Sequence, residues 1–163
     1  GIIALNKGVN GETTEEMLGR FEADVISHRP RAVTILGGTN DAWMQVPAGA
    51  VAENVEAMAK RAVHEGIVPV VALPPPLCIS VMEGMSPGFL EMMARRLDHY
   101  RTVYRELAQT LNLPVLDFYT PMLDPATGWG RAEYFFDDAH PSIAGYRAMG
   151  EAAAAVFREV FTV

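Results

Sequence analysis

The sequence predicts an α/β domain with a parallel sheet, because short apolar runs alternate with longer amphipathic ones. Four short runs are predicted as buried strands, covering residues 1–6, 32–36, 67–73 and 114–118. In the segments between them, apolar residues recur every three or four positions, which is the period of an α-helix. Strands that alternate with helices form a parallel sheet with helices on both faces. The length fits one domain over residues 1–163.

Capping signals place the ends of the first two predicted helices. Thr13 followed by Glu16 is typical of a capping box, so the first helix should begin here and end before Pro30. The second helix is predicted over residues 48–65, and Gly66 is the residue expected to end it.

Two longer helices are predicted in the second half of the chain. Ser86 and Pro87 have the residue types of an N-cap and a first helical position, and the apolar stripe that follows extends to Leu111. The last helix is predicted over residues 142–161. Its inward face should consist of Tyr146, Met149, Ala153, Val156, Phe157 and Val160.

Composition excludes several classes of function. A net charge of −7 argues against a nucleic-acid surface, which needs clustered Lys and Arg. No apolar run approaches the length of a membrane span. The single cysteine, Cys78, excludes an internal disulfide and a cysteine-rich zinc site, and it weakly favours a cytoplasmic location. Phosphate-loop and dinucleotide-binding motifs are absent from the sequence, so phosphoryl transfer and hydride transfer are not expected. Nothing in the sequence indicates an oligomeric state.

Residues with chemical potential follow the predicted strands. Gly11, Asn40 and the pair Asp137 and His140 lie in the loops after the first, second and fourth strands, and three prolines follow the third. Ligands of parallel α/β sheets bind beyond the carboxyl ends of the strands. The four loops are therefore expected to meet at one edge of the sheet.

The strongest candidate for chemistry is His140, which alone among the four histidines lies in a loop at this edge. An imidazole titrates near neutral pH and can accept and return a proton. Asp137, three residues earlier, can orient the ring through a hydrogen bond. Two alternatives stay open. Asp137 and Asp138 could only favour the amino end of the last helix, or the three residues could bind a metal, although ligands so close in sequence rarely surround one ion.

A second candidate is the turn at residues 37–41, Gly-Gly-Thr-Asn-Asp. The glycines allow close backbone approach to a ligand, and the neutral amide of Asn40 suits the negative oxygen of a tetrahedral intermediate. Gly11 could offer its backbone N–H to the same oxygen. In the simpler alternative both segments are ordinary turns, in which Gly, Asn and Asp are common for conformational reasons.

Together and in this order, the motifs resemble the SGNH hydrolases, also called the GDSL esterase/lipase family. Gly11 matches the glycine block, Gly-Thr-Asn-Asp at 38–41 matches the asparagine block, and Asp137 to His140 match the Asp-x-x-His block. The resemblance implies a three-layer, flavodoxin-like α/β/α fold. It implies that His140 is the general base, that Asp137 orients it, and that Gly11 and Asn40 form the oxyanion hole. It implies ester hydrolysis through an acyl-enzyme, without a metal or cofactor.

One block of the family pattern has no match. The nucleophilic serine of the Gly-Asp-Ser block should precede Gly11 by a strand, a loop and a helix, and the chain begins shortly before Gly11. The serines present are Ser27, Ser80, Ser86 and Ser142, and none follows a strand in a Gly-Asp context. A family strand that lies between the first two predicted strands is missing as well. We therefore expect the 163 residues to be a fragment of a longer protein.

The function expected from the sequence is hydrolysis of short acyl esters of small molecules. Thr39, Trp43, Pro75 and Phe136 are the residues expected to contact the substrate, and Met44, Met82, Met85 and Trp129 add apolar character to the same loops. Two other classes stay open. One is a non-catalytic member of the fold that binds a small ligand or carbohydrate. The other is a flavodoxin-like regulatory or nucleotide-binding domain, because a fold alone does not fix a function.

Overall fold

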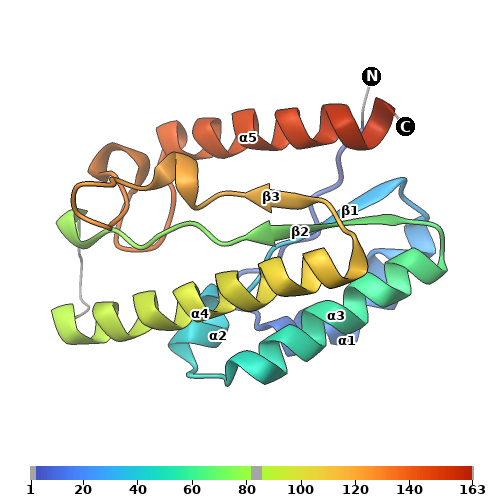
Figure 1. The fold of residues 1–163 in the computed structure, drawn as a ribbon, viewed down its shortest axis with the longest axis horizontal. Helices are drawn as coiled ribbons and strands as arrows, with labels where there is room; N and C mark the ends of the chain where they lie inside the picture. Colours follow the sequence, from blue (N-terminus) through green and yellow to red (C-terminus); the bar gives the residue numbers. More distant parts are fainter. Residues whose placement is uncertain (1–2, 82–85, 163) are drawn as a thin grey trace.

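The computed structural model, which describes residues 3–81 and 86–162, confirms the α/β fold with its parallel sheet (Figure 1). In this part of the chain three strands lie side by side in sequence order: β1 (Ala32–Ile35), β2 (Val68–Leu73) and β3 (Val115–Asp117). They pair in parallel, with Ala32 opposite Val68 and Val71 opposite Val115. These strands match the last three of the four that the sequence predicts.

Helices cover both faces of the sheet. They are α1 (Thr14–Asp24), α2 (Thr39–Trp43), α3 (Ala48–His64), α4 (Pro87–Leu111) and α5 (Ile143–Thr162). Short 3₁₀ turns occur at Ile26–His28, Ile79–Val81, Thr120–Met122 and Ala132–Tyr134. Because consecutive strands are neighbours, the right-handed crossovers α3 and α4 lie on one face, together with α1 and α2. Helix α5 covers the opposite face (Figure 1).

Each face has its own apolar core. The larger core lies under α1, α3 and α4 and includes Phe21, Ile35, Val51, Val55, Met58, Leu73, Leu90, Met93, Leu97, Tyr100 and Tyr104. The smaller core lies under α5 and consists of Val70, Ala72, Cys78, Leu116, Phe118, Met122, Phe135 and Met149. Among the described helices, none combines the length and apolar character that a bilayer span requires.

The predicted capping signals are confirmed. The hydroxyl of Thr13 caps α1, and the Glu16 carboxylate accepts the Thr13 N–H at 2.8 Å, which completes the capping box. At the start of α4, the Ser86 hydroxyl accepts the Phe89 N–H at 3.3 Å. After α3, Gly66 has a φ of 72°, a conformation that glycine adopts without strain.

The predicted first strand is wrong for the residues that the structure describes. Residues 3–6 have no regular structure, and the side chains of Ile3 and Leu5 are 88% and 65% exposed. The reason is that a strand exists only with a hydrogen-bonded neighbour, and β1 pairs with β2 rather than with this segment. An apolar run alone does not supply that neighbour. Residues 1 and 2 lie outside the described part of the chain.

The prediction of which residues form the inward face of the last helix is also partly wrong. Tyr146 is 61% exposed, whereas Gly145 and Met149 are buried. Gly145 lies tight against the backbone of Tyr134, so the helix turns its 145–149 side to the preceding loop and the smaller core. Tyr146 then falls one position outside the buried stripe. The remaining predicted positions, Ala153, Val156, Phe157 and Val160, pack against the smaller core.

Candidate active site

The loop before α5 holds the imidazole of His140 against the carboxylate of Asp137. His140 Nδ1 lies 2.8 Å from Asp137 Oδ2 and 3.0 Å from Oδ1. The side chain of His140 is 77% exposed and that of Asp137 is 23% exposed. With a proton on Nδ1, the ring donates to Asp137 and presents Nε2 to solvent as a proton acceptor. The local geometry is that of a general base with its orienting carboxylate.

Asp137 is charged at neutral pH. Partial burial raises the pKa of its carboxyl group, but hydrogen bonds outweigh this and hold the pKa below its usual range. The bonds come from the backbone N–H groups of Ala139 at 2.9 Å and His140 at 2.7 Å, and from the His140 ring. The same contacts that orient the ring therefore keep its partner ionised.

Two observations bear on the alternative roles of this segment. The first turn of α5 is capped by Ser142, whose hydroxyl accepts the Gly145 N–H at 3.2 Å, so Asp137 is not the residue that caps it. Within residues 3–81 and 86–162, no group of three His, Cys, Asp or Glu side chains is arranged to hold a metal ion. Asp138 is buried, and its carbonyl accepts the N–H of Cys78 at 2.9 Å.

The turn after β1 brings Asn40 and Gly11 together. The sequence predicts a turn at residues 37–41, but its last three residues belong to the short helix α2. The Asn40 amide donates one hydrogen bond to the carbonyl of Glu12 at 2.8 Å, and a side-chain amide has a second N–H to offer. Gly11, next to Glu12, has a φ of 82°. The glycine turn and the amide thus lie beside each other, as the sequence predicts.

The side chain of Asp41 holds the Gly11 turn and Asn40 in these positions. Its carboxylate is fully buried and accepts the Thr14 N–H at 3.1 Å and the Thr14 hydroxyl at 2.6 Å. Asn54 of α3 donates to the same hydroxyl at 3.1 Å. These bonds tie the start of α1, and with it the Gly11 turn, to α2. The role of Asp41 is therefore structural: its buried carboxylate holds two segments of the site together.

A side chain at position 38, just before α2, would be strained, so glycine is required there. The φ of Gly38 is 120°, outside the range that L side chains adopt readily. A Cβ atom here would lie 3.3 Å from Tyr100 Cδ2 and 3.3 Å from the Tyr104 hydroxyl, both on α4. The turn that carries Asn40 is therefore pressed directly against α4.

The four expected substrate contacts lie around this edge. Trp43 is half exposed on α2 and meets Phe89 edge-on, with ring centroids 5.0 Å apart. Phe136, beside Asp137, is 79% exposed. Thr39 and Pro75 are half-buried. Of the other apolar residues, Met44 is exposed and Trp129 packs against the larger core, while Met82 and Met85 lie outside the described residues.

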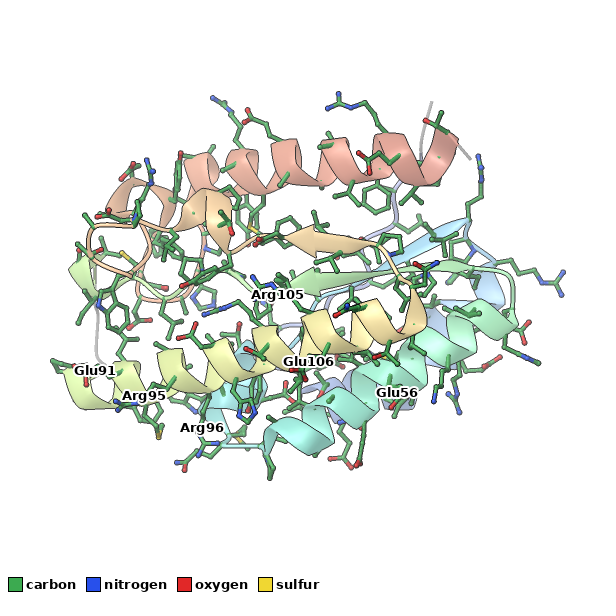
Figure 2. The ribbon with its side chains drawn as sticks, in the orientation of Figure 1. Glu56, Glu91, Arg95, Arg96, Arg105 and Glu106 are labelled. Carbon is green, nitrogen blue, oxygen red and sulfur yellow. The ribbon has the colours of Figure 1, made fainter. Side chains whose placement is uncertain are left out.

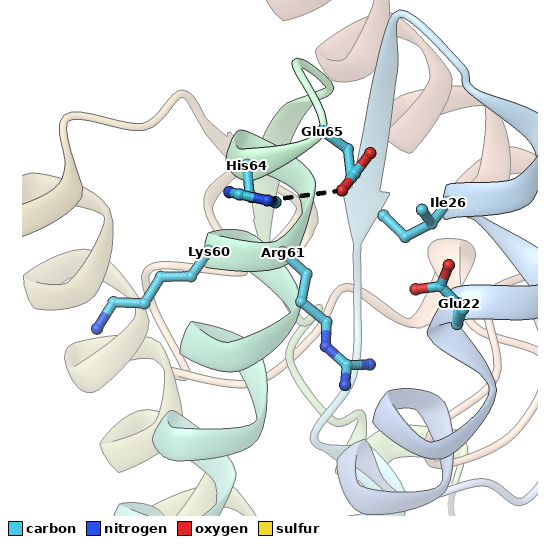
Figure 3. Close-up of a pocket in the computed structure, with 6 residues that line it drawn as sticks. All are labelled: Glu22, Ile26, Lys60, Arg61, His64 and Glu65. Atoms are coloured by element: carbon cyan, nitrogen blue, oxygen red, sulfur yellow. Dashed lines mark ion pairs between the residues drawn. The ribbon is translucent and has the colours of Figure 1, made fainter.

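Two surface hollows lie away from the Asp137–His140 and Gly11–Asn40 pairs. One lies between α1 and α3 and is lined by Glu22, Ile26, Lys60, Arg61, His64 and Glu65 (Figure 3). These residues are at the carboxyl ends of the helices that precede β1 and β2. The hollow therefore lies where the strands begin, whereas the candidate site lies where they end. The second is polar and lies in the loop over residues 124–133, with Ser80 at its side.

None of the four serines is placed as a nucleophile for His140. Ser27 donates to the carbonyl of Ala23 at 2.5 Å, and Ser86 and Ser142 cap α4 and α5. Ser80 lines the polar hollow. No hydrogen bond among the described residues joins His140 to Asn40. Both pairs lie along the carboxyl edge of the sheet.

The fold and the order of these motifs place the chain in the SGNH class of hydrolases. The model of the GDSL-like Lipase/Acylhydrolase family matches residues 2–148, and the chain belongs to this family.

Individual relatives agree with this assignment. The chain is 27% identical to an acetylxylan esterase of Geobacillus stearothermophilus over 157 residues, covering 93% of this chain and 70% of the esterase. It is 26% identical to the uncharacterised lipoprotein YqeF of Bacillus subtilis, of which it spans 58%. A solved structure from Desulfitobacterium hafniense, described as a lipolytic protein of the G-D-S-L family, has a TM-score of 0.78 and 31% identity. That match covers 93% of this chain and 79% of the other.

Proposed function

We propose that the protein is a serine ester hydrolase that cleaves short acyl esters through an acyl-enzyme. The observation that carries the proposal is the His140 ring, held on Asp137 through Nδ1 with Nε2 open to solvent. In the first step His140 takes the proton of the nucleophilic hydroxyl and then returns it to the departing alcohol. In the second step it takes a proton from water as the water oxygen attacks the acyl carbon. It then returns this proton to the serine oxygen, so that the acyl–serine bond breaks and the acid is released.

The oxyanion hole of the proposed reaction consists of the Gly11 N–H and the Asn40 amide. Both are neutral donors, and the Asn40–Glu12 bond and the buried Asp41 hold them before substrate arrives. Donors fixed in advance stabilise the negative oxygen of a tetrahedral intermediate without reorganisation during the reaction.

The nucleophile of the proposed reaction is a serine that is not among residues 1–163. Of the serines described above, Ser86 and Ser142 cap helices, and Ser27 and Ser80 lie in short 3₁₀ turns. Among the described strands, β1 pairs on one side only, and Thr34 in it is exposed. A parallel strand beside β1 would end at the same edge as Gly11 and Asn40. We propose that such a strand carries the serine and completes the domain.

The substrate class that we propose is the acetyl ester of a small alcohol or sugar. The acetylxylan esterase relative supports the acetyl group, and its solved catalytic mutants replace a serine in one case and a histidine in the other by alanine. Thr39, Trp43, Pro75 and Phe136 are placed around the edge where the ester would bind. The exposed rings of Trp43 and Phe136 suit the apolar face of a sugar or a short acyl chain.

The proposal is tested with the complete protein that contains these residues. We expect it to hydrolyse p-nitrophenyl acetate and to react with a fluorophosphonate, which labels only activated serines. Peptide mapping of the label should identify one serine outside residues 1–163. A complete protein that binds acetylated sugars but neither hydrolyses them nor takes the label would instead be the non-catalytic member of the fold.

A further inference from the structure

One turn of α4 carries three buried polar side chains that the proposed chemistry does not use. Tyr100, Arg101 and Tyr104 are 1%, 3% and 0% exposed. We propose that these three are positioning residues that hold both halves of the site, so that their loss lowers turnover rather than substrate binding. This inference rests on the proposed esterase function.

The two tyrosines hold the turn that carries Asn40. The Tyr104 hydroxyl donates to the carbonyl of Gly37 at 3.1 Å, and the Tyr100 hydroxyl donates to the carbonyl of Val46 at 2.5 Å. These two carbonyls lie just before and just after α2, so the helix is fixed at both ends. Burial raises the pKa of both phenols, with the nearby charge of Asp41 adding to the effect, so both stay protonated donors.

Arg101 holds a different segment, the one that follows β2. Its guanidinium donates to the carbonyls of Pro74 at 3.0 Å and Pro75 at 3.2 Å, and to the Asp98 carboxylate at 2.8 Å. The same group lies 4.0 Å from the centre of the Tyr119 ring, in the loop after β3. One side chain therefore connects the loops that follow two neighbouring strands.

The segment that Arg101 holds continues to the catalytic pair. Directly after the three prolines, the carbonyl of Leu77 accepts the Gly130 N–H at 2.7 Å. Next to it, the N–H of Cys78 donates to the carbonyl of Asp138 at 2.9 Å. Asp138 adjoins Asp137, which orients His140. The long loop over residues 119–141 is thus anchored to a strand end that Arg101 fixes.

The energetics favour a positioning role over plain stabilisation. Burying a cation is costly, and burial indeed lowers the pKa of Arg101 despite its bond to Asp98, whose side chain is 62% exposed. An apolar side chain would fill the same space without that cost. What an apolar side chain lacks is N–H donors directed at the backbone carbonyls of Pro74 and Pro75. Prolines also lack an N–H, so their loop has few other ways to be fixed.

The test compares two substitutions in the complete protein, Tyr104→Phe and Arg101→Met, with the matched control Arg105→Met. Arg105 lies one turn further along α4 and is exposed (Figure 2). Each variant is assayed for kcat and KM on p-nitrophenyl acetate, and kcat is expressed per serine labelled by fluorophosphonate. This normalisation removes any misfolded fraction from the comparison.

We expect Tyr104→Phe to lower kcat about threefold to tenfold, the effect of one lost hydrogen bond. Arg101→Met should lower kcat about tenfold to a hundredfold, because small displacements of reacting groups are costly. In both variants KM should change by less than about twofold, since the substrate contacts remain. Arg105→Met should match the unmodified protein in kcat and KM.

A spectroscopic readout separates the two halves. The ring ¹⁵N signals of His140 should shift in Arg101→Met and stay in place in Tyr104→Phe. If Arg101→Met does not fold, Arg101→Lys replaces it. Lysine keeps the charge but not the fork of donors, so an intermediate kcat is expected.

The outcomes are distinguishable from failure of the proposed function. A complete protein without esterase activity would refute the function itself. An active protein in which Tyr104→Phe and both Arg101 variants retain kcat, or lose it only through KM, would overturn the positioning roles and leave the function standing.

Discussion

The two halves of the candidate site are built in opposite ways. The pair Asp137 and His140 lies within four consecutive positions, and its carboxylate is held by backbone N–H groups of the same segment. The pair Gly11 and Asn40 comes from two segments about thirty positions apart. They are joined by the hydrogen bond that the Asn40 amide donates to the Glu12 carbonyl and by the buried Asp41. A locally built half can lose its chemistry without loss of stability. A half assembled from distant segments should lose both together.

The largest effect is expected for His140→Ala in the complete protein. Removing the general base of a serine hydrolase should lower kcat by a factor on the order of 10³ to 10⁶. Because the side chain is 77% exposed, the free energy of unfolding should change by less than about 0.5 kcal/mol. Ester hydrolysis and urea unfolding measure the two quantities.

The matched control for this variant is His99→Ala. His99 is an exposed histidine on α4, and the same substitution there should leave both kcat and stability unchanged. Full esterase activity of His140→Ala would contradict the mechanism.

The next effect is expected for Asn40→Ala. Loss of one oxyanion donor should lower kcat by a factor on the order of 10² to 10³. Unlike the histidine variant, this one should also lose about 1 kcal/mol of stability, because the bond to Glu12 is lost. Kinetics and urea unfolding on the same preparation measure both. Loss of activity without any loss of stability would show that the two halves do not differ in this way.

Asp41→Asn tests the assembled half through stability alone. An asparagine directs an N–H toward the Thr14 N–H and leaves a buried donor unsatisfied, so the free energy of unfolding should fall by about 2 to 3 kcal/mol. The control is Asp24→Asn, which removes a partly exposed ion pair with Arg20 and should cost under about 1 kcal/mol. If the two substitutions lowered the free energy of unfolding equally, Asp41 would not be the residue that holds these segments together.

The smallest expected effect is on how the free energy of unfolding depends on pH in acid. The folded pKa of Asp137 lies below its ordinary value, so its contribution to stability is present above the unfolded pKa of about 3.9 and is lost as pH falls through the lowered value. Stability measured from pH 5 downward should therefore decline less steeply in Asp137→Asn than in the unmodified protein. Parallel curves would mean that the pair contributes nothing to the fold.

Much of this architecture is predictable from sequence because it depends on neighbours in the chain. The capping box at Thr13 and Glu16, the Ser86 cap and the glycine stop at Gly66 are local devices, and the structure confirms all three. The same holds for the Asp137–His140 contact, whose partners are three residues apart. The prediction that Gly11 lies beside Asn40 used the rule that parallel strands end at a common edge. The neighbours are as predicted although the segment before Gly11 is not a strand, because Asn40 binds the Glu12 carbonyl.

What escaped prediction depends on partners distant in sequence. The apolar run at residues 3–6 has strand composition, yet whether it pairs depends on which strand lies beside it. Tyr100 and Tyr104 fit the apolar stripe of α4, and the stripe does not reveal that their hydroxyls bind carbonyls 54 and 67 positions away. Arg101 looks like one more surface cation of a helix rich in them. Its burial is decided by the prolines after β2.

The tight turn at Gly38 limits how this scaffold can be redesigned. A side chain at position 38 would meet a backbone conformation unsuited to it and the rings of Tyr100 and Tyr104 at once, so relieving either obstacle leaves the other. Combinatorial libraries aimed at new substrates should therefore keep position 38 fixed. Diversity belongs at Trp43 and Met44, whose side chains are 50% and 66% exposed at the other end of the same short helix.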